Sequence, residues 1–431
     1  MAEPTIRELA ERHWQGDGDL EHGEHPVRPI AGRQSEEIAD GLLYVKSVAS
    51  ANTLDTGEGL VMLDTGGAFD TNHLHAQVRA WRPSTPLAAA VFSHHHVDHV
   101  FGTAPFESDA EANGWRRPVV YGHEEMPAHF ARYAKTQGWN TAINQRQFAG
   151  DGSMKWPTEF RLPDVTYRDK ITFTEGDLTF ELNPARGETD DATWTWVPER
   201  RILHPGDLFI WAVPNAGNPQ KVQRYLSEWA LALRQMATLD AEIMLSGHGL
   251  PVFGAERIRA ALTDTAELLD SIEHQTIALM NEGRSLDHVI HAVEVPAHLS
   301  DKPYLRPVYD HPQFLVRNVW RRYGGWYDGE PDNLLPAPRA AQAIEWVALA
   351  GGLAKVLARV QELVDAGDLR LACHLAEFAV LAEPAATDAH SMRASVYAAR
   401  SEQQESSMAR NILGHAARAS EQGLRDIAGN Y

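Results

Sequence analysis

The sequence predicts a mixed α/β domain followed by an all-α domain. Between Gly41 and Gly254, short apolar runs alternate with glycine, aspartate and proline, a pattern typical of buried strands. Stretches with helical spacing lie between some of these runs, which favours an α/β arrangement. After Gly254 the strand signals fade and helix-forming sequence takes over. We therefore divide the chain into domains of residues 1–300 and 301–431.

Individual elements of the first domain can be assigned from their patterns. The runs Gly59–Gly66 and Pro86–Phe92 are short, apolar and bounded by turn residues, so we expect each to be a strand. Apolar residues recur at helical spacing in Thr71–Trp81 and in Gln223–Leu239, which predicts two helices. The candidate functional residues all fall in this domain.

The sequence predicts helices for most of the remaining chain. Helix-forming sequence runs from Ala255 to about Val295, and a tract rich in proline and aromatics, residues 303–338, predicts an ordered, tightly turned connector. Beyond it, apolar residues recur at helical spacing from Leu353 to Val364, and further helices are expected at Leu369–Leu381 and from about Asp388. Paired short helices are typical of a tetratricopeptide-like array, although no fixed repeat period is present, and an ordinary helical bundle fits equally well.

Composition excludes several classes of protein. A length of 431 residues favours two domains. The formal net charge of −20 repels nucleic acid and anionic membrane surfaces, so neither is expected as a partner. No apolar stretch is long enough for a membrane span and no secretory signal is evident, which predicts a cytoplasmic protein. The single cysteine, Cys373, fits a reducing compartment.

The densest cluster of chemically active side chains is the run His94-His95-His96-Val97-Asp98-His99. It follows the predicted strand ending at Phe92, so it leaves a sheet edge and enters a loop where side chains can converge. Imidazole and carboxylate together suit zinc, with room left for water. A surface histidine tract is the alternative, but the spacing and the strand context favour a metal site.

This motif resembles the signature of the metallo-β-lactamase superfamily, and three further motifs match its order. They are Leu63-Asp64-Thr65-Gly66, His204-Pro205-Gly206-Asp207 and Leu245-Ser246-Gly247-His248-Gly249. The resemblance implies an αββα sandwich with two zinc ions per chain. It also implies that Asp207 bridges the two ions, that His248 is a ligand, and that Asp64 supports the ligands from beside the site.

One position departs from the common pattern of that superfamily. A histidine is usual where this chain has Glu188, within Gly187-Glu188-Thr189-Asp190. Either Glu188 is a solvated turn residue and the site has lost a ligand, or the carboxylate ligates directly, as glutamate does in other zinc enzymes. A glutamate in this position is a feature of the alkyl sulfatase branch. If Glu188 ligates directly, the chain therefore resembles that branch.

A second stretch is similar to the alkyl sulfatases. Residues 304–309 and 326–331, together with the helices that follow, resemble the dimerisation domain of those zinc enzymes. This resemblance implies a homodimer. Two features differ from the branch: the bridging position holds Asp207 where a glutamate is common, and the sequence has no room for a sterol-carrier-like third domain. A smaller or more polar ester than a long alkyl sulfate would therefore suit this chain.

The resemblance implies a complete ligand set and a reaction. One ion would take His94, His96 and Glu188, and the other would take Asp98, His99 and His248. Three carboxylates facing two dications favour a metal-bridging hydroxide as the nucleophile at neutral pH, with Asp98 and Asp207 as the catalytic carboxylates. The expected reaction is metal-assisted hydrolysis of a sulfate ester or a related small ester.

An anionic ester bound by an acidic protein needs local positive charge and hydrogen-bond donors. The segment after Asp207 supplies candidates for holding a sulfate or carboxylate, namely Asn218, Lys221, Arg224 and Tyr225. Each of them is equally well explained as an ordinary surface polar group near the start of a helix. Tyr304, Arg306 and Tyr309 allow the same two interpretations.

Two other functions remain open at this point. A lactonase, thioesterase or other hydrolase of the superfamily would have the same ligands, because metal ligands determine the attack and not the leaving group. A catalytically silent dimeric scaffold is a third hypothesis, which the seven intact candidate ligands disfavour.

Overall fold

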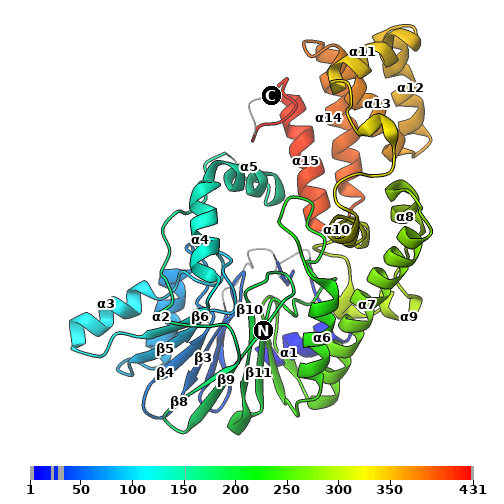
Figure 1. The fold of residues 1–431 in the computed structure, drawn as a ribbon. Coiled ribbons are helices and arrows are strands. Elements are labelled where there is room, and N and C mark those ends of the chain that lie inside the picture. Colours follow the sequence, from blue (N-terminus) through cyan, green and yellow to red (C-terminus); the bar gives the residue numbers. More distant parts are fainter. Residues whose placement is uncertain (1–3, 21–23, 28–33, 151, 429–431) are drawn as a thin grey trace.

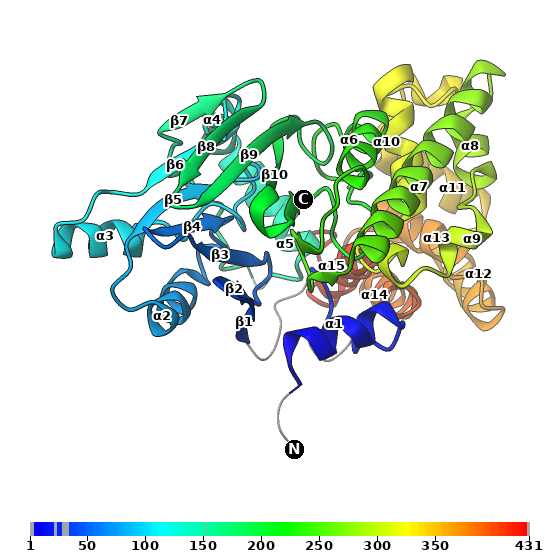
Figure 2. The same ribbon diagram turned by 90° about the horizontal axis from the view of Figure 1, so that it is seen from below.

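The computed structural model describes residues 4–20, 24–27, 34–150 and 152–428. Two β-sheets lie face to face and carry helices on their outer faces, and a group of helices follows at one end (Figures 1 and 2). This is the αββα sandwich of a metallo-β-lactamase fold followed by an all-helical region, as the sequence predicts.

The first sheet has seven strands in chain order. Its first half is antiparallel, and β4, β5, β6 and β7 run parallel to one another. The strands are β1 Ser35–Ala39, β2 Leu42–Val45, β3 Ala51–Asp55, β4 Leu60–Leu63, β5 Leu87–Val91, β6 Val119–His123 and β7 Val165–Tyr167.

The second sheet has six strands in the order β13-β12-β11-β10-β9-β8. Only the pair of β11 and β12 is parallel. The strands are β8 Ile171–Glu175, β9 Leu178–Ala185, β10 Ala192–Val197, β11 Ile202–Gly206, β12 Ile243–Ser246 and β13 Val252–Phe253.

Three hydrophobic clusters build the sandwich. One fills the space between the sheets, with Leu63 and Val91 from the first sheet facing Phe180 and Leu245 from the second. A second joins the first sheet to α2, α3 and α4, and a third joins the second sheet to α6, α7 and the helices that follow. The helices of this part are α1 Ile6–Trp14, α2 Thr71–Trp81, α3 Ala104–Asn113, α4 Met126–Lys135, α5 Gln137–Gln147, α6 Leu226–Ala237 and α7 Ala255–Asn281.

The helices of the C-terminal region pack largely in chain order, each against its neighbours. Apolar residues of α11 to α14 form their own cluster. The last helix returns to the sandwich and packs on α5, where the Asn411 amide donates to the Gln147 carbonyl at 2.7 Å. The helices are α8 Leu286–Ala292, α9 Ala297–Ser300, α10 Pro312–Gly324, α11 Arg339–Leu349, α12 Leu353–Asp365, α13 Leu369–Ala382, α14 Thr387–Glu402 and α15 Ser407–Glu421.

One sequence-based expectation for this region is confirmed and one needs correction. The tract from Ala255 to about Val295 is helical, as expected, and forms α7 and α8 with a break at Gly283, whose φ of +75° a helix does not accommodate. The predicted connector, residues 303–338, contains the helix α10. Pro312 suits a first helical turn, the His311 side chain accepts from the Gln313 amide, and buried Leu315, Val316 and Val319 share one face. Abundant proline and aromatics concealed that periodicity.

The division after residue 300 stays a prediction. Leu299 before it and Leu315 after it belong to the same hydrophobic cluster. Among the residues that the structure describes, no helix is both long and apolar enough to cross a bilayer.

Candidate metal centre

The predicted ligands lie at one edge of the sandwich, where strands from both sheets end. Asp64 follows β4 and the His94–His99 run follows β5, while Asp207 follows β11 and His248 follows β12. The strands within each of these two pairs are parallel, so their carboxyl ends open at the same edge. Local sequence motifs at four strand ends thus become one site.

Close approach of the strand ends requires glycine. A side chain at Gly247 would collide with the Asp207 carboxylate, and one at Gly206, whose φ is +54°, would meet Ser93 at 2.7 Å. Asp64 itself has a φ of +56°, a strained conformation for a residue with a side chain, of the kind that clusters at functional sites.

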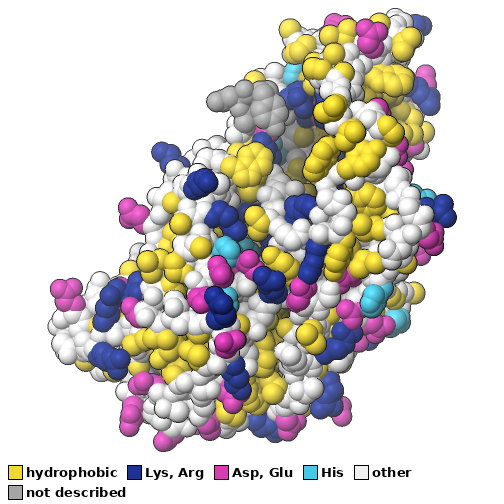
Figure 3. Space-filling view, in the orientation of Figure 1, with side chains coloured by type: hydrophobic (Ala, Val, Ile, Leu, Met, Phe, Trp, Pro, Cys, Tyr) yellow, Lys and Arg dark blue, Asp and Glu magenta, His cyan; other side chains and the backbone are white. Residues whose placement is uncertain are grey.

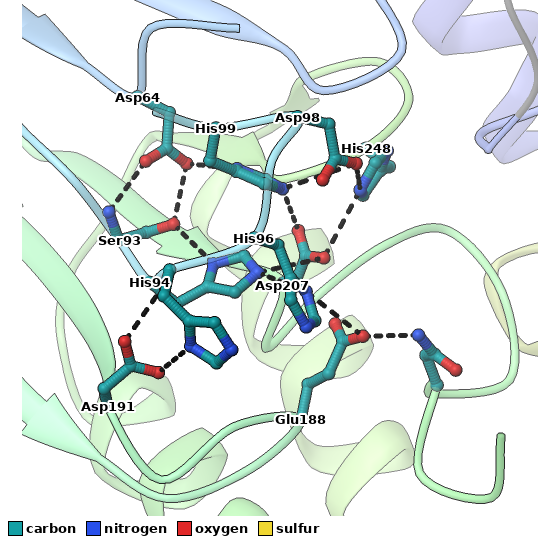
Figure 4. A network of polar contacts seen from close by, with 12 residues as sticks. Asp64, Ser93, His94, His96, Asp98, His99, Glu188, Asp191, Asp207 and His248 are labelled. Carbon is teal, nitrogen blue, oxygen red and sulfur yellow. Dashed lines mark hydrogen bonds and ion pairs between the residues drawn. The ribbon is translucent and has the colours of Figure 1, made fainter. Parts of the chain in front are cut away.

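Two groups of side chains present ligand atoms to a common centre (Figure 4). The first group is His94, His96, Glu188 and Asp207, and the second is Asp98, His99 and His248. In the first group His94 Nε2 is 3.7 Å from Asp207 Oδ2, and His96 Nδ1 is 3.6 Å from Glu188 Oε1.

Asp207 also contacts the second group. Its Oδ1 is 3.3 Å from His99 Nε2, and its Oδ2 is 3.3 Å from His248 Nε2. Asp98 Oδ2 is 3.4 Å from His248 Nε2. Ligand atoms about 2.1 Å from one tetrahedral ion are about 3.4 Å apart, so these spacings suit a divalent metal.

Buried polar atoms that lack a partner support the same conclusion. The buried polar atoms without a hydrogen bond among the described residues include three at the candidate ligands, His99 Nε2, Glu188 Oε2 and Asp207 Oδ1. Such atoms are costly unless something else satisfies them. All three belong to the two groups, so the chain offers a divalent metal site to which these donors fit.

The electrostatics of the site follow from its burial. Burial raises the pKa of Glu188 to about 8, with Arg224 opposing and Asp207 adding to the rise. Burial alone would raise the pKa of Asp207, but His248 and His99 hold it well below its ordinary value. Burial would likewise lower the pKa of His248, yet Asp207 raises it to about 9. Buried carboxylate here is balanced by imidazolium, a charge that a metal dication can replace.

Asp64 lies where the sequence predicts, beside the ligands and fully buried. Its Oδ2 is 2.7 Å from His99 Nδ1, and its two oxygens accept from the Ser93 amide and hydroxyl at 2.7 Å each. This contact leaves His99 Nε2 pointing at Asp207. A carboxylate that orients a histidine in this way is the common support of metal ligands.

The four predicted substrate contacts lie in different surroundings. Arg224 is buried and its Nη1 is 2.7 Å from Glu188 Oε1, so its charge faces a candidate ligand. Asn218 and Lys221 instead bind α5, through Gln147 and Asn144 at 3.1 and 2.8 Å. Burial and Arg224 lower the pKa of Lys221 to about 7.

The Tyr225 ring lies outside the ligand groups, within 5.0 Å of the Arg186 guanidinium and 5.2 Å of that of Arg322. Tyr304 and Arg306 pair with Asp264 and Glu405. In the part of the chain that the structure describes, no side-chain hydrogen bond, ion pair or ring contact connects any of these three to a candidate ligand.

Sequence reasoning did not assign a role to two residues at the site. Asn215 donates its amide to Glu188 Oε1. Tyr309, left ambiguous by the sequence, is buried and its hydroxyl accepts from Gln147 Nε2 at 2.6 Å. No motif surrounds these side chains, and only the packing of the 215–225 segment and of α5 brings them near Glu188.

Family models match two parts of the chain. Residues 48–248 match the model of the metallo-beta-lactamase superfamily, and residues 285–423 match the model of the alkyl sulfatase dimerisation domain. The chain therefore contains one domain of each kind. The first match contains every candidate ligand, from His94 to His248.

Curated relatives of the chain are sulfatases. A linear primary-alkylsulfatase of a Pseudomonas species is 26% identical over 346 residues, covering 76% of this chain and 65% of that protein. An (R)-specific secondary-alkylsulfatase of a Pseudomonas species is 26% identical over 410 residues, covering 87% and 61%. An alkyl/aryl-sulfatase of Saccharomyces cerevisiae is 22% identical, covering 83% and 60%. The chain thus spans less than two thirds of the length of these relatives.

A solved structure has the same fold. The stereoselective inverting sec-alkylsulfatase Pisa1 from a Pseudomonas species superposes with a TM-score of 0.82 at 24% identity, covering 92% of this chain and 66% of that one. Both the sandwich and the helical region are therefore shared with that protein.

Proposed function

We propose that this protein is a homodimeric hydrolase of sulfate esters that uses two zinc ions per chain. The observation that carries the proposal is the match of residues 285–423 to the alkyl sulfatase dimerisation model, because metal ligands alone do not identify the leaving group. Glu188 in place of the superfamily's usual histidine supports the same branch.

In this proposal His94, His96 and Glu188 would hold one ion, Asp98, His99 and His248 would hold the other, and Asp207 would contribute to both. Zinc ions, when bound, lower the pKa of water and polarise the ester. The chain's own residues orient these donors: Asp64 holds His99, and Arg224 with Asn215 holds Glu188. The Asp98 and His96 side chains are 25% and 18% exposed, so we place the approach of the substrate on their side.

One panel of substrates tests the activity. Purified protein would be assayed with short and long alkyl sulfates, lactones, thioesters and a β-lactam, with metal content measured alongside. We expect sulfate release from alkyl sulfates and about two zinc ions per chain. Turnover confined to lactones or thioesters would contradict the sulfatase proposal, and near-zero metal in carefully prepared protein would contradict every enzymatic version of it.

The homodimer has support from exposed apolar side chains on the helical region. Trp346 is 58% exposed and Leu349 80% exposed on α11, and hydrophobic side chains gather over this part of the surface (Figure 3). We expect the double variant Trp346→Glu, Leu349→Glu to be monomeric by light scattering. Leu162→Glu, which changes a 50% exposed leucine of the sandwich, is the control that should stay dimeric. The cytoplasmic location stays a prediction from the sequence.

A further inference from the structure

His95, the second of the four histidines in the run, belongs to neither ligand group. Its ring is 1% exposed, and its Nδ1 is 2.8 Å from Asp191 Oδ1, while its backbone amide donates to Asp191 Oδ2 at 3.1 Å. Asp191 is fully buried. Two contacts from one residue thus occupy both oxygens of this carboxylate.

The other ring nitrogen of His95 receives an arginine. Arg132 Nη2 lies 3.0 Å from His95 Nε2. A guanidinium offers only N–H donors, so Nε2 must be the acceptor and the ring proton must be on Nδ1, where it is donated to Asp191. The geometry therefore assigns one direction to the whole chain of hydrogen bonds, from Arg132 through His95 to Asp191.

One face of α4 is built around this histidine. His129, Arg132 and Tyr133 lie three and four residues apart, so they share a side of the helix. The His129 ring lies 4.3 Å from the His95 ring, and the Tyr133 ring lies 5.3 Å from it. The packing of these rings against His95 thus fixes the position of α4, and with it the position of the Arg132 side chain.

His95, His129 and Asp191 also satisfy the spacing of a metal site. Two observations argue against a third ion there. Both Asp191 oxygens are already bonded to His95, and the Arg132 cation occupies the remaining nitrogen of the ring. A dication would have to displace the half-buried guanidinium of Arg132 from this ring.

Arg132 is half-buried, and it differs from Arg224, the buried cation of the site. The charge of Arg224 is balanced by Glu188 at 2.7 Å. Within residues 4–20, 24–27, 34–150 and 152–428, no ion pair connects Arg132 to a carboxylate. A position in the last turn of α4 favours a cation, but it does not require a hydrogen bond to a buried histidine.

The location of Arg132 places this charge beside the candidate ligands. The His95 ring that it contacts is 5.0 Å from the His96 ring. Its charge also acts on Lys221, a side chain that Asp98 and Glu188 influence as well. On the side of α4, Arg132 is thus connected to the candidate ligand His96 through the ring of His95. On the side of the 215–225 segment, Arg224 contacts the candidate ligand Glu188.

We propose that Arg132 binds an oxyanion of the substrate and that Asp191 and His95 are positioning residues that hold its guanidinium toward the metal site. The oxyanion is the sulfate group itself or a carboxylate elsewhere on the ester. The inference rests on the proposed function for the identity of the substrate, but not for the binding of the anion.

A binding experiment tests the arginine without turnover. Inorganic sulfate and acetate would each be titrated calorimetrically into the zinc-loaded wild type and into Arg132→Ala. Loss of a charge-assisted hydrogen bond should weaken binding about tenfold. The matched control is Lys135→Ala, which removes an exposed cation from the same turn of α4 and should bind as the wild type does.

Every outcome of this titration has a meaning. A loss for sulfate alone assigns Arg132 to the sulfate group, a loss for acetate alone assigns it to a carboxylate, and a loss for both supports a general oxyanion site. Unchanged binding of both anions to Arg132→Ala, or no binding of either anion to the wild type, overturns the proposal. Failure of the sulfatase assay with these losses intact would overturn only the proposed function.

The positioning role needs its own variants. His95→Leu removes the two hydrogen bonds of the ring, to Asp191 and to Arg132, and should weaken oxyanion binding as much as Arg132→Ala does. His95→Gln keeps an acceptor for Arg132 and should restore part of the oxyanion affinity. The double variant His95→Leu, Arg132→Ala should be no weaker than Arg132→Ala, since the two changes remove one interaction. In an active enzyme the loss should raise KM more than it lowers kcat.

Metal content per chain separates this role from a simple structural one. It should stay unchanged in His95→Leu and in Asp191→Asn. Loss of metal in both variants would make the network a support of the metal ligands and overturn the positioning role. Oxyanion affinity equal to that of the wild type in both variants would also overturn it.

Discussion

The two ligand groups of the metal site are supported in opposite ways. In the group of Asp98, His99 and His248, the Asp64 carboxylate contacts the outer nitrogen of His99 at 2.7 Å and makes the histidine a stronger donor. In the group of His94, His96 and Glu188, the Arg224 cation lies 2.7 Å from the Glu188 carboxylate and competes for its negative charge. We therefore expect the group of Asp98, His99 and His248 to bind its ion more tightly than the group of His94, His96 and Glu188.

Asp207 contacts both groups, so its replacement should have the largest effect. We expect Asp207→Asn to lower the zinc content below one ion per chain and the hydrolysis rate by about a thousandfold or more, because each ion contributes several kcal/mol to catalysis. Zinc content by elemental analysis and kcat/KM for an alkyl sulfate would measure the two effects. Two ions retained per chain would show that Asp207 does not join the groups.

Replacement of Glu188 should separate the groups. We expect Glu188→Ala to reduce the zinc content from two ions to about one, since only the group that contains Glu188 loses a ligand. The measurement is again elemental analysis, with a chelator titration to follow the remaining ion. Unchanged occupancy would mean that Glu188 is not a ligand.

The support of His99 by Asp64 should contribute less than a ligand does. Asp64→Asn is expected to lower the affinity for one zinc ion by about 10-fold to 100-fold, which is the usual effect of losing a carboxylate that supports a ligand. Asp109→Asn is the matched control, because Asp109 also lies 2.7 Å from a histidine, His75, but that histidine belongs to neither ligand group. Equal effects of the two variants on zinc affinity would contradict the role of Asp64.

The smallest effect is expected where the charge beside Glu188 is kept. Arg224→Lys should change the zinc affinity of the Glu188 group by less than about threefold. One nitrogen of Arg224, Nη1, contacts both the backbone carbonyl and the Oε1 of Glu188, and an ammonium can replace that nitrogen. Competition with a chromophoric chelator would measure it. A change above tenfold would show that the planar guanidinium, and not its charge, holds Glu188.

Much of the fold and of the candidate site could be predicted from short sequence patterns. Thr71–Trp81 forms the helix expected there, and the run Pro86–Phe92 contains strand β5. The helix α10 could not be predicted, because proline and aromatics masked a periodicity that becomes visible only when Leu315 and Val319 are buried against α7. A local sequence pattern predicts a helix or strand when the spacing of its apolar residues alone shows which face will be buried.

The sequence by itself determined the fold class and the seven candidate ligands, because the ligands stand in compact motifs at strand ends whose order is specific. Only the tertiary structure decided what surrounds them. Arg224, predicted to bind substrate, contacts Glu188 across 36 residues of chain, and His95 joins Arg132 and Asp191 across 37 and 96 residues. The physical reason is that a charged side chain takes its partner from whatever packing brings near, and sequence spacing does not encode distances between residues so far apart.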